Sequence, residues 1–339
     1  MSRHPLPPAI GRTAPHPTPR RDRSPLPLRV GTRASPLALI QTRAFMARLV
    51  GFCPVLHAAE AFEEHAITTS GDRVQDRALA EIGGKGLFAK EIHELLADGR
   101  IDFAVHSLKD LETTLPEGIV LACCMTREDA RDALVLGPRC GAPDPQDPFA
   151  AIPPGATVGT ASVRRAAQLL HRRPDLRPAL LRGNVGTRIA KVRAGEVDAT
   201  FLAYAGLRRL GLEHEAAAVL DPTVMVPAAG QGIVGVTVRA ADVELRDLLS
   251  GIEDAEAAAV SRAERAMLAA LDGSCRTPIG GHAEIGADGA LHLTGLVARA
   301  DGSFLLKRAI SGAPSEAEAL GRTLGESLRR DSPADIFLP

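Results

Sequence analysis

From Leu28 onward, short apolar runs alternate with stretches of helical periodicity, and this alternation restricts the fold more than any other feature of the sequence. It is typical of βαβ units, in which helices join parallel strands. The first unit is a strand at 28–32 and a helix beginning at Ser35-Pro36, where serine can cap the helix and proline fits its first turn. A helix at 87–97 leads to buried strands at 101–106 and 119–125. The sequence therefore predicts an α/β fold.

Two Pro/Gly-rich stretches divide this pattern. Residues 130–154 surround one short apolar run, and residues 226–232 interrupt the pattern again. Between the two stretches the alternation restarts, with strands expected at 157–160, 179–182 and 198–204 and helices at 162–170 and 184–194. After the second stretch, the β-rich segment 233–238 could return to the first lobe. Two crossings of this kind predict two α/β lobes with a hinged cleft between them.

The C-terminal part has a different pattern. An Ala-rich helix at 255–271 precedes three alternating segments and a closing helix at 315–329, as in a small α+β domain. At the other end, residues 1–27 hold eight Pro and five Arg against a single acid, a composition typical of disorder. We expect a disordered extension at 1–27, an α/β domain at 28–126 and 227–250, an Arg-rich anion-binding α/β domain at 131–223, and an α+β domain at 254–339.

Composition excludes several classes of protein. With 40 Lys and Arg against 41 Asp and Glu, the net charge of −1 gives no whole-chain attraction to nucleic acid or to an acidic membrane. Aromatic residues are only 3%, so platforms for stacking bases are hard to assemble. Apolar runs are too short for a membrane span. The five cysteines form no CxxC pair, which suits the reducing cytoplasm, where we expect this protein.

Positive charge is concentrated in the second lobe. Residues 155–211 hold eleven Lys and Arg against three acids. Arg164, Arg165, Arg182 and Arg188 stand where strands are followed by helices, at the edge that lines the cleft in open α/β sheets. Guanidinium groups there would bind carboxylate or phosphate. By contrast, Arg172, Arg173 and Arg177 are interpreted as a solvated helix face.

A polar cluster follows the strand at 101–106. Ser107, Lys109 and Asp110 lie directly after it, and Arg33 holds the equivalent place after the first strand. A carboxylate beside an ammonium group is a candidate for acid–base chemistry or for stabilising a cation. A helix cap with a salt bridge is the structural alternative, and the residues alone leave both open.

Other motifs separate into structural and reactive candidates. Gly83–Gly86 lacks the order of a nucleotide loop and is interpreted as a lid. The ten histidines form no HExxH motif, so no metal site is expected. Cys123 and Cys124 lie in an apolar strand and are expected in the core. Cys275 differs because it follows a helix in a polar loop beside Arg276, where a thiolate able to form a covalent bond is favoured.

Together these segments resemble the porphobilinogen deaminase family over about residues 28–329. The motifs that carry the resemblance are GTRASPLALIQ (31–41), GGKGLFAKEI (83–92), AVHSLKD (104–110), GTASVRR (159–165), RGNVGTR (182–188), AGLRRLG (205–211), PAAGQGIVG (227–235) and LDGSCRTPIG (271–280). The resemblance implies two lobes like those of type II periplasmic binding proteins and a third domain. It further implies a monomeric transferase that joins four porphobilinogens head to tail on a covalent dipyrromethane, with loss of ammonia and final release of hydroxymethylbilane.

The resemblance also implies residue roles. Asp110 would be the catalytic carboxylate. Cofactor-binding positions are Cys275 through a thioether, Ser107, Lys109, Ser162, Arg164, Arg165, Arg188 and Arg209. Substrate-binding positions are Arg33, Gln41, Phe88, Arg182 and Gln231. Leu111-Glu112 replaces the Val-Pro common after the catalytic aspartate, so the turn there is expected to differ. The main alternative is a two-lobe binding protein that holds an anionic small molecule without catalysis, and a nucleic-acid-binding module is more remote.

Overall fold

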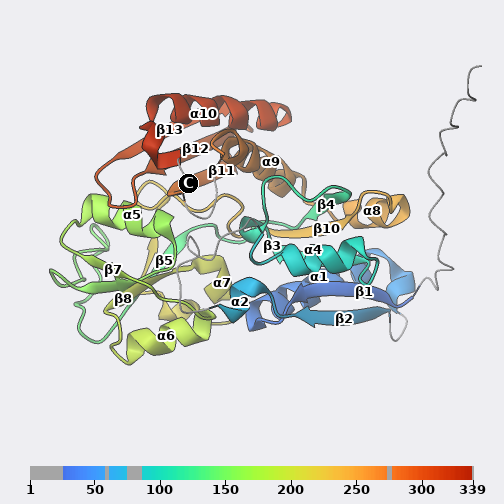
Figure 1. Ribbon diagram of the computed structural model, residues 1–339, viewed down its shortest axis with the longest axis horizontal. Coiled ribbons are helices and arrows are strands. Elements are labelled where there is room, and N and C mark those ends of the chain that lie inside the picture. The colour runs from blue at the N-terminus through green and yellow to red at the C-terminus, as the bar shows by residue number, and fades with distance from the viewer. Residues whose placement is uncertain (1–25, 58–60, 75–85, 273–276, 338–339) are drawn as a thin grey trace, which may run out of the picture.

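A computed structural model describes residues 26–57, 61–74, 86–272 and 277–337. Two α/β lobes lie side by side, and a third, smaller domain lies across both of them (Figure 1). The predicted extension at 1–27 falls almost entirely outside the described residues, as do Cys275 and most of the Gly83–Gly86 loop. No helix in the described ranges is both long and apolar enough to cross a membrane.

Lobe 1 is built on a five-stranded sheet of order β2-β1-β3-β10-β4. β1 runs parallel to β2 and β3, whereas β10 is antiparallel to β3 and β4. The elements of lobe 1 are β1 (Leu28–Arg33), α1 (Pro36–Phe52), β2 (Phe62–Ile67), α2 (Ser70–Arg73), α4 (Lys90–Ala97), β3 (Phe103–Ser107), β4 (Ile119–Cys124), β10 (Val234–Arg239) and α8 (Val243–Ser250). β10 follows lobe 2 in the sequence, so the chain returns from lobe 2 to pair with β3 and β4 in this sheet.

Lobe 2 repeats the arrangement with the order β7-β6-β8-β5-β9. Here β5 arrives from lobe 1 and is antiparallel to β8 and β9, so each lobe contains one strand delivered by a crossing. The elements of lobe 2 are β5 (Asp132–Leu136), β6 (Thr157–Gly159), α5 (Val163–Arg172), β7 (Arg177–Ala179), α6 (Val185–Arg193), β8 (Ala199–Ala203), α7 (Tyr204–Arg209) and β9 (Ala218–Leu220). We call residues 125–131 the first crossing and residues 221–233 the second crossing.

The third domain is an antiparallel sheet of order β11-β12-β13 covered by two helices. Its elements are α9 (Ala255–Ala270), β11 (Ile279–Ile285), β12 (Leu291–Ala298), β13 (Leu305–Gly312) and α10 (Ala317–Asp331). Buried Met267, Leu293 and Leu324 belong to one apolar cluster that joins helices and sheet. The expected fold, two lobes of the type II binding-protein kind plus a small α+β domain, is confirmed by these three sheets.

The local signals for helix starts hold in the structure. The Ser35 Oγ accepts a hydrogen bond from the backbone of Ala38 at 3.3 Å, with proline in the first turn of α1. Asn184 caps α6 in the same way, through Thr187 N at 2.8 Å. Such caps satisfy backbone N–H groups that the first helical turn leaves without partners. They fix where helices follow the strand ends that carry the polar residues.

Three details differ from the sequence predictions. The helix expected at 87–97 begins at Lys90, after a turn. The strand expected at 179–182 lies instead at Arg177–Ala179, an edge strand that tolerates Pro178 because its outer side needs no ladder hydrogen bond. Arg173 is not merely a solvated side chain, since it donates to the carbonyl oxygens of Phe149 and Ile152.

Candidate active site

Asp110 lies at the end of a rigid segment. Directly after β3, residues Leu108–Asp110 form one turn of 3₁₀ helix whose Leu108 side chain is buried. The Leu108 N–H donates to the carbonyl of Ile233 at 3.0 Å, so the second crossing holds this turn in place. The Asp110 carboxylate therefore projects from backbone that is fixed on two sides.

Arg33, at the end of β1, connects two carboxylates. Its Nη1 donates to Asp110 Oδ2 at 3.2 Å, and its Nε and Nη2 both donate to Asp72 of α2. Burial disfavours the guanidinium charge, but the hydrogen bond to Asp72 and the charges of Asp110 and Asp72 outweigh it and raise the pKa of Arg33. The guanidinium also lies 4.2 Å from the ring centre of Phe88. These contacts fix the direction in which Arg33 presents its charge.

A pocket opens in lobe 1 around Asp110. The Ser107 hydroxyl donates to Gln41 Oε1 at 3.1 Å within it. The lining comprises Arg33, Ser35, Leu37, Ala38, Gln41, Phe88, Val105, His106, Ser107, Lys109 and Asp110. Six of the residues singled out from the sequence, drawn from three separate motifs, thus line one pocket.

Lys109 points from lobe 1 toward the crossings. Its Nζ donates to Gln231 Oε1 at 3.2 Å. Burial, together with the nearby positive charge of Arg165, lowers the pKa of Lys109 to about 8, although Asp110 and Asp132 act in the opposite direction. An ammonium group depleted of water in this way gains more from an incoming carboxylate than a solvated one would.

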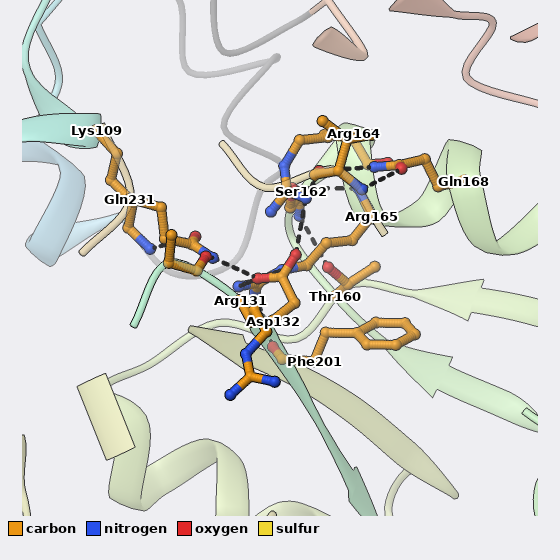
Figure 2. A network of polar contacts seen from close by, with 12 residues as sticks. Lys109, Arg131, Asp132, Thr160, Ser162, Arg164, Arg165, Gln168, Phe201 and Gln231 are labelled. Atoms are coloured by element: carbon orange, nitrogen blue, oxygen red, sulfur yellow. Dashed lines mark hydrogen bonds and ion pairs between the residues drawn. The ribbon is translucent and has the colours of Figure 1, made fainter. Parts of the chain in front are cut away.

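Asp132, the first residue of β5, binds both arginines of the GTASVRR motif. Its side chain is fully buried, and it accepts hydrogen bonds from Arg164 Nη1 at 2.8 Å and from Arg165 Nη2 at 2.7 Å. Burial alone would raise the pKa of Asp132, but these two guanidinium groups hold it well below its usual range. Figure 2 shows Asp132 between the two arginines on one side and Gln231 on the other.

The two arginines differ in what they leave available. Arg165 gives its Nε and Nη2 to Asp132 and its Nη1 to the carbonyl of Phe201 at 2.8 Å. Arg164 uses only Nη1, for Asp132 and for the carbonyl of Val226. Among the described residues, the Nε and Nη2 of Arg164 have no hydrogen-bond partner. The bidentate edge of Arg165 is therefore committed inside the protein, whereas Arg164 keeps donors for a ligand.

The remaining predicted arginines reach the same region from lobe 2. Arg188 donates from Nε to Gly183 O at 2.8 Å, and burial with the charges of Arg165 and Arg182 lowers its pKa to about 10. Arg182 donates from Nη2 to Gly71 O of lobe 1 at 2.7 Å. Arg209 donates to Gly232 O of the second crossing at 2.7 Å, and burial lowers its pKa. Arg182 thus contacts lobe 1 directly, and Arg209 contacts the second crossing.

The structure places most of the predicted site residues in this one region. Ser162 has a structural contact instead: its Oγ caps α5 by accepting a hydrogen bond from Arg165 N at 3.4 Å. Cys275 lies outside the described residues. Two anions of the site were not predicted from the sequence: Asp72, which binds Arg33, and Asp132, which binds Arg164 and Arg165. The only signal for Asp132 was an acid at the start of an apolar run.

The donor set suits an organic polycarboxylate. It offers one ammonium and several guanidinium groups that are partly removed from water, and such groups bind carboxylates through charge-assisted hydrogen bonds. Within the described ranges, no group of three or more His, Cys, Asp or Glu residues could hold a metal ion. Dipyrromethane carries acetate and propionate side chains, so the free donors of Arg164, Lys109 and Arg188 fit this cofactor.

Comparison with protein families agrees with this chemistry. The family model described as porphobilinogen deaminase, dipyromethane cofactor binding domain, matches residues 28–247. The chain belongs to the porphobilinogen deaminase family. A second model, for the C-terminal domain of porphobilinogen deaminase, matches residues 258–330. The resemblance drawn from the sequence motifs is thereby confirmed.

Several curated porphobilinogen deaminases are similar over nearly their whole length. The protein of Paracoccus denitrificans is 48% identical over 92% of this chain and 96% of its own. That of Sorangium cellulosum is 48% identical over 90% of this chain and 99% of its own. That of Synechococcus elongatus is 44% identical over 92% and 94%. The chain is thus a hydroxymethylbilane synthase with a dipyrromethane cofactor, acting on porphobilinogen in tetrapyrrole biosynthesis, and the binding-protein alternative is not supported.

Proposed function

We propose that Asp110 is the catalytic carboxylate of this porphobilinogen deaminase. The observation that carries the proposal is its placement: Asp110 is a carboxylate on fixed backbone, oriented by Arg33, and the only acidic residue among the described residues that line its pocket. Loss of ammonia from porphobilinogen leaves a positive charge delocalised over the pyrrole. A fixed negative charge at that place stabilises the charge as it develops and accepts hydrogen bonds from pyrrole N–H groups.

We propose that the surrounding residues divide into two groups. When bound, dipyrromethane supplies the pyrrole carbon to which the first porphobilinogen is joined. Its side-chain carboxylates are held by Ser107, Lys109, Ser162, Arg164, Arg165, Arg188 and Arg209, with Cys275 as the covalent anchor. Incoming substrate is held by Arg33, Gln41, Phe88, Arg182 and Gln231. Within the first group, Arg165 acts mainly by holding Asp132, the partner of Arg164, because Asp132 and Phe201 occupy its donors.

Growth of the product makes demands on the whole cleft. The cofactor and the added rings bring many carboxylates into one space. Several arginines in the same cleft reduce the repulsion between these carboxylates. We propose that residues 28–126 with 227–250, residues 131–223 and residues 254–339 move as three domains about the crossings to make room. The contact of Arg182 with Gly71 would open and close with that movement.

We propose that the enzyme acts as a monomer in the cytoplasm, without nucleic-acid or membrane partners. The four described cysteines are free thiols, which suits a reducing compartment. Light scattering of the purified protein at working concentration measures its molar mass and so tests whether it is a monomer. A stable dimer peak would contradict it.

The proposed anchor is tested by intact mass. Purified parent protein should carry the mass of two pyrrole units, and Cys275→Ser should lack it because a hydroxyl is a far weaker nucleophile than a thiolate. The matched control is Cys140→Ser, at a described thiol whose Sγ donates to Asp198 O at 3.2 Å, and it should keep the adduct. An undiminished adduct on Cys275→Ser would assign the cofactor to another thiol.

A further inference from the structure

Asp132 has more contacts than an ordinary buried ion pair. Its Oδ2 accepts from Arg164, and its Oδ1 accepts from Arg165 and from Gln231 Nε2, the last at 2.8 Å. The side chain has no exposed surface. A carboxylate that is fully desolvated is costly unless several donors surround it, so its surroundings are held in a defined arrangement.

The partners of Asp132 come from helix α5 of lobe 2 and from the second crossing. Asp132 itself directly follows the first crossing. Gln231 belongs to the second crossing, and Arg164 of α5 also donates to the carbonyl of Val226, within that crossing, at 2.6 Å. The two crossings are thus bound to each other and to lobe 2 through one carboxylate (Figure 2).

The same network extends into lobe 1 through Gln231. Its amide nitrogen donates to Asp132 and to the carbonyl of Ala130, which fixes which way the amide faces. The amide oxygen is therefore turned toward Lys109, whose Nζ donates to it at 3.2 Å. The orientation of Gln231 depends on Asp132, and the ammonium position depends on Gln231.

We infer that Asp132 is a positioning residue for the reaction: through Gln231 it holds the Lys109 ammonium beside Asp110, and through direct ion pairs it presents the free donors of Arg164. This inference rests on the proposed site and goes beyond it, because Asp132 is fully buried and is not among the residues proposed to bind cofactor or substrate. Asp132 acts on Lys109 by its charge as well as through Gln231, so replacing Gln231, which leaves that charge in place, separates positioning from charge alone.

The charges around Lys109 determine in which direction its pKa should move when Asp132 is neutralised. The charges that act on Lys109 are those of Arg165 and Arg164, which disfavour its ammonium form, and those of Asp110 and Asp132, which favour it. Neutralising Asp132 removes one favourable charge and releases the acceptor Gln231. The pKa of Lys109 should therefore fall below its value of about 8 in the parent.

The test reads Lys109 directly in the resting protein. The chain has only five lysines, so protein labelled with ¹³C at lysine Cε gives few signals. The signal of Lys109 is assigned by its loss in Lys109→Arg. In Asp132→Asn we expect its titration midpoint to move down by roughly half a pH unit or more. In protein with its cofactor, the alkaline limb of the activity profile should move in the same direction.

The matched control is Asp102→Asn. Asp102 is also a buried carboxylate held by two arginines, Arg29 at 2.9 Å and Arg239 at 3.4 Å, but within lobe 1 and away from Lys109. It should leave the Lys109 midpoint unchanged. Gln231→Met breaks the relay but keeps the charge and the ion pairs of Asp132, and it should also lower the midpoint because Lys109 loses its acceptor.

An unchanged Lys109 midpoint in Asp132→Asn or in Gln231→Met would overturn the inference. That result is separable from a failure of the proposed catalytic role of Asp110. The titration is read without substrate and needs no turnover, whereas the role of Asp110 is judged by turnover alone.

Discussion

Arg33 binds Asp110 and Asp72 at once, with 3.2 Å between its Nη1 and the Asp110 Oδ2. Asp72 takes the Nε and Nη2 edge of the guanidinium, so Asp110 receives a single donor from the remaining nitrogen. Arg33 thereby aims the Asp110 carboxylate without enclosing it in a bidentate pair. A carboxylate held in this way keeps lone pairs for the pyrrole N–H groups of a ligand.

Replacing Arg33 should reduce turnover more than stability. Arg33→Ala removes a hydrogen bond to a charged group, typically worth about 1.5–3 kcal/mol, from a half-buried site. We expect kcat/KM to fall by roughly tenfold to a hundredfold. Arg43→Ala is the control because its pair with Glu64 is on the surface. Parent-like turnover by folded Arg33→Ala would show that Arg33 has no role in the reaction.

Arg182 and Arg172 should behave differently although both belong to the Arg-rich lobe. Arg182 is buried and donates to Gly71 across the lobes, so Arg182→Ala loses a cation and an interlobe contact together. Turnover should be severely reduced. Arg172 is 45% exposed, 3.8 Å from its acidic partner, and Arg172→Ala should change turnover little. Equal losses in steady-state assays would show that the cleft has been misplaced.

Two buried histidines should make the enzyme less stable in mild acid. Burial lowers the pKa of His93 to about 4 and that of His106 to about 3, and their rings are 5.4 Å apart. Unfolded histidine titrates near 6.5, so the unfolded chain binds protons first as pH falls. Stability is full above about pH 6.5 and is lost toward pH 4, by roughly 2 kcal/mol per histidine at pH 5.

Urea unfolding at pH 7, 6 and 5 measures this loss. His93→Leu removes one of the two groups, so its stability should fall less steeply with pH than that of the parent. His57→Gln, at an exposed position, should follow the parent. The same pH dependence in parent and His93→Leu would show that His93 is not the responsible group.

Short sequence signals predict some of this architecture. The caps at Ser35 and Asn184 fix helix starts, and Arg33 lies at the end of the strand before the first cap, as predicted. The anions that organise those arginines were not predictable. Asp132 lies 32 residues from Arg164, and its burial depends on how β5 enters the other lobe's sheet. Likewise, the sequence could not show that the Nε and Nη2 of Arg165 both donate to Asp132 inside the protein.

The central claim is that the charge of Asp110 drives each condensation. Asp110→Asn preserves size while removing the charge, and Asp110→Glu restores it one methylene further out, where catalytic groups tolerate displacement poorly. The measurement is porphobilinogen consumption by variants whose cofactor content has been verified by intact mass. We predict the order parent, then Asp110→Glu well below it, then Asp110→Asn near background. Turnover by cofactor-loaded Asp110→Asn within about tenfold of the parent, worth only ~1.4 kcal/mol, would contradict the account.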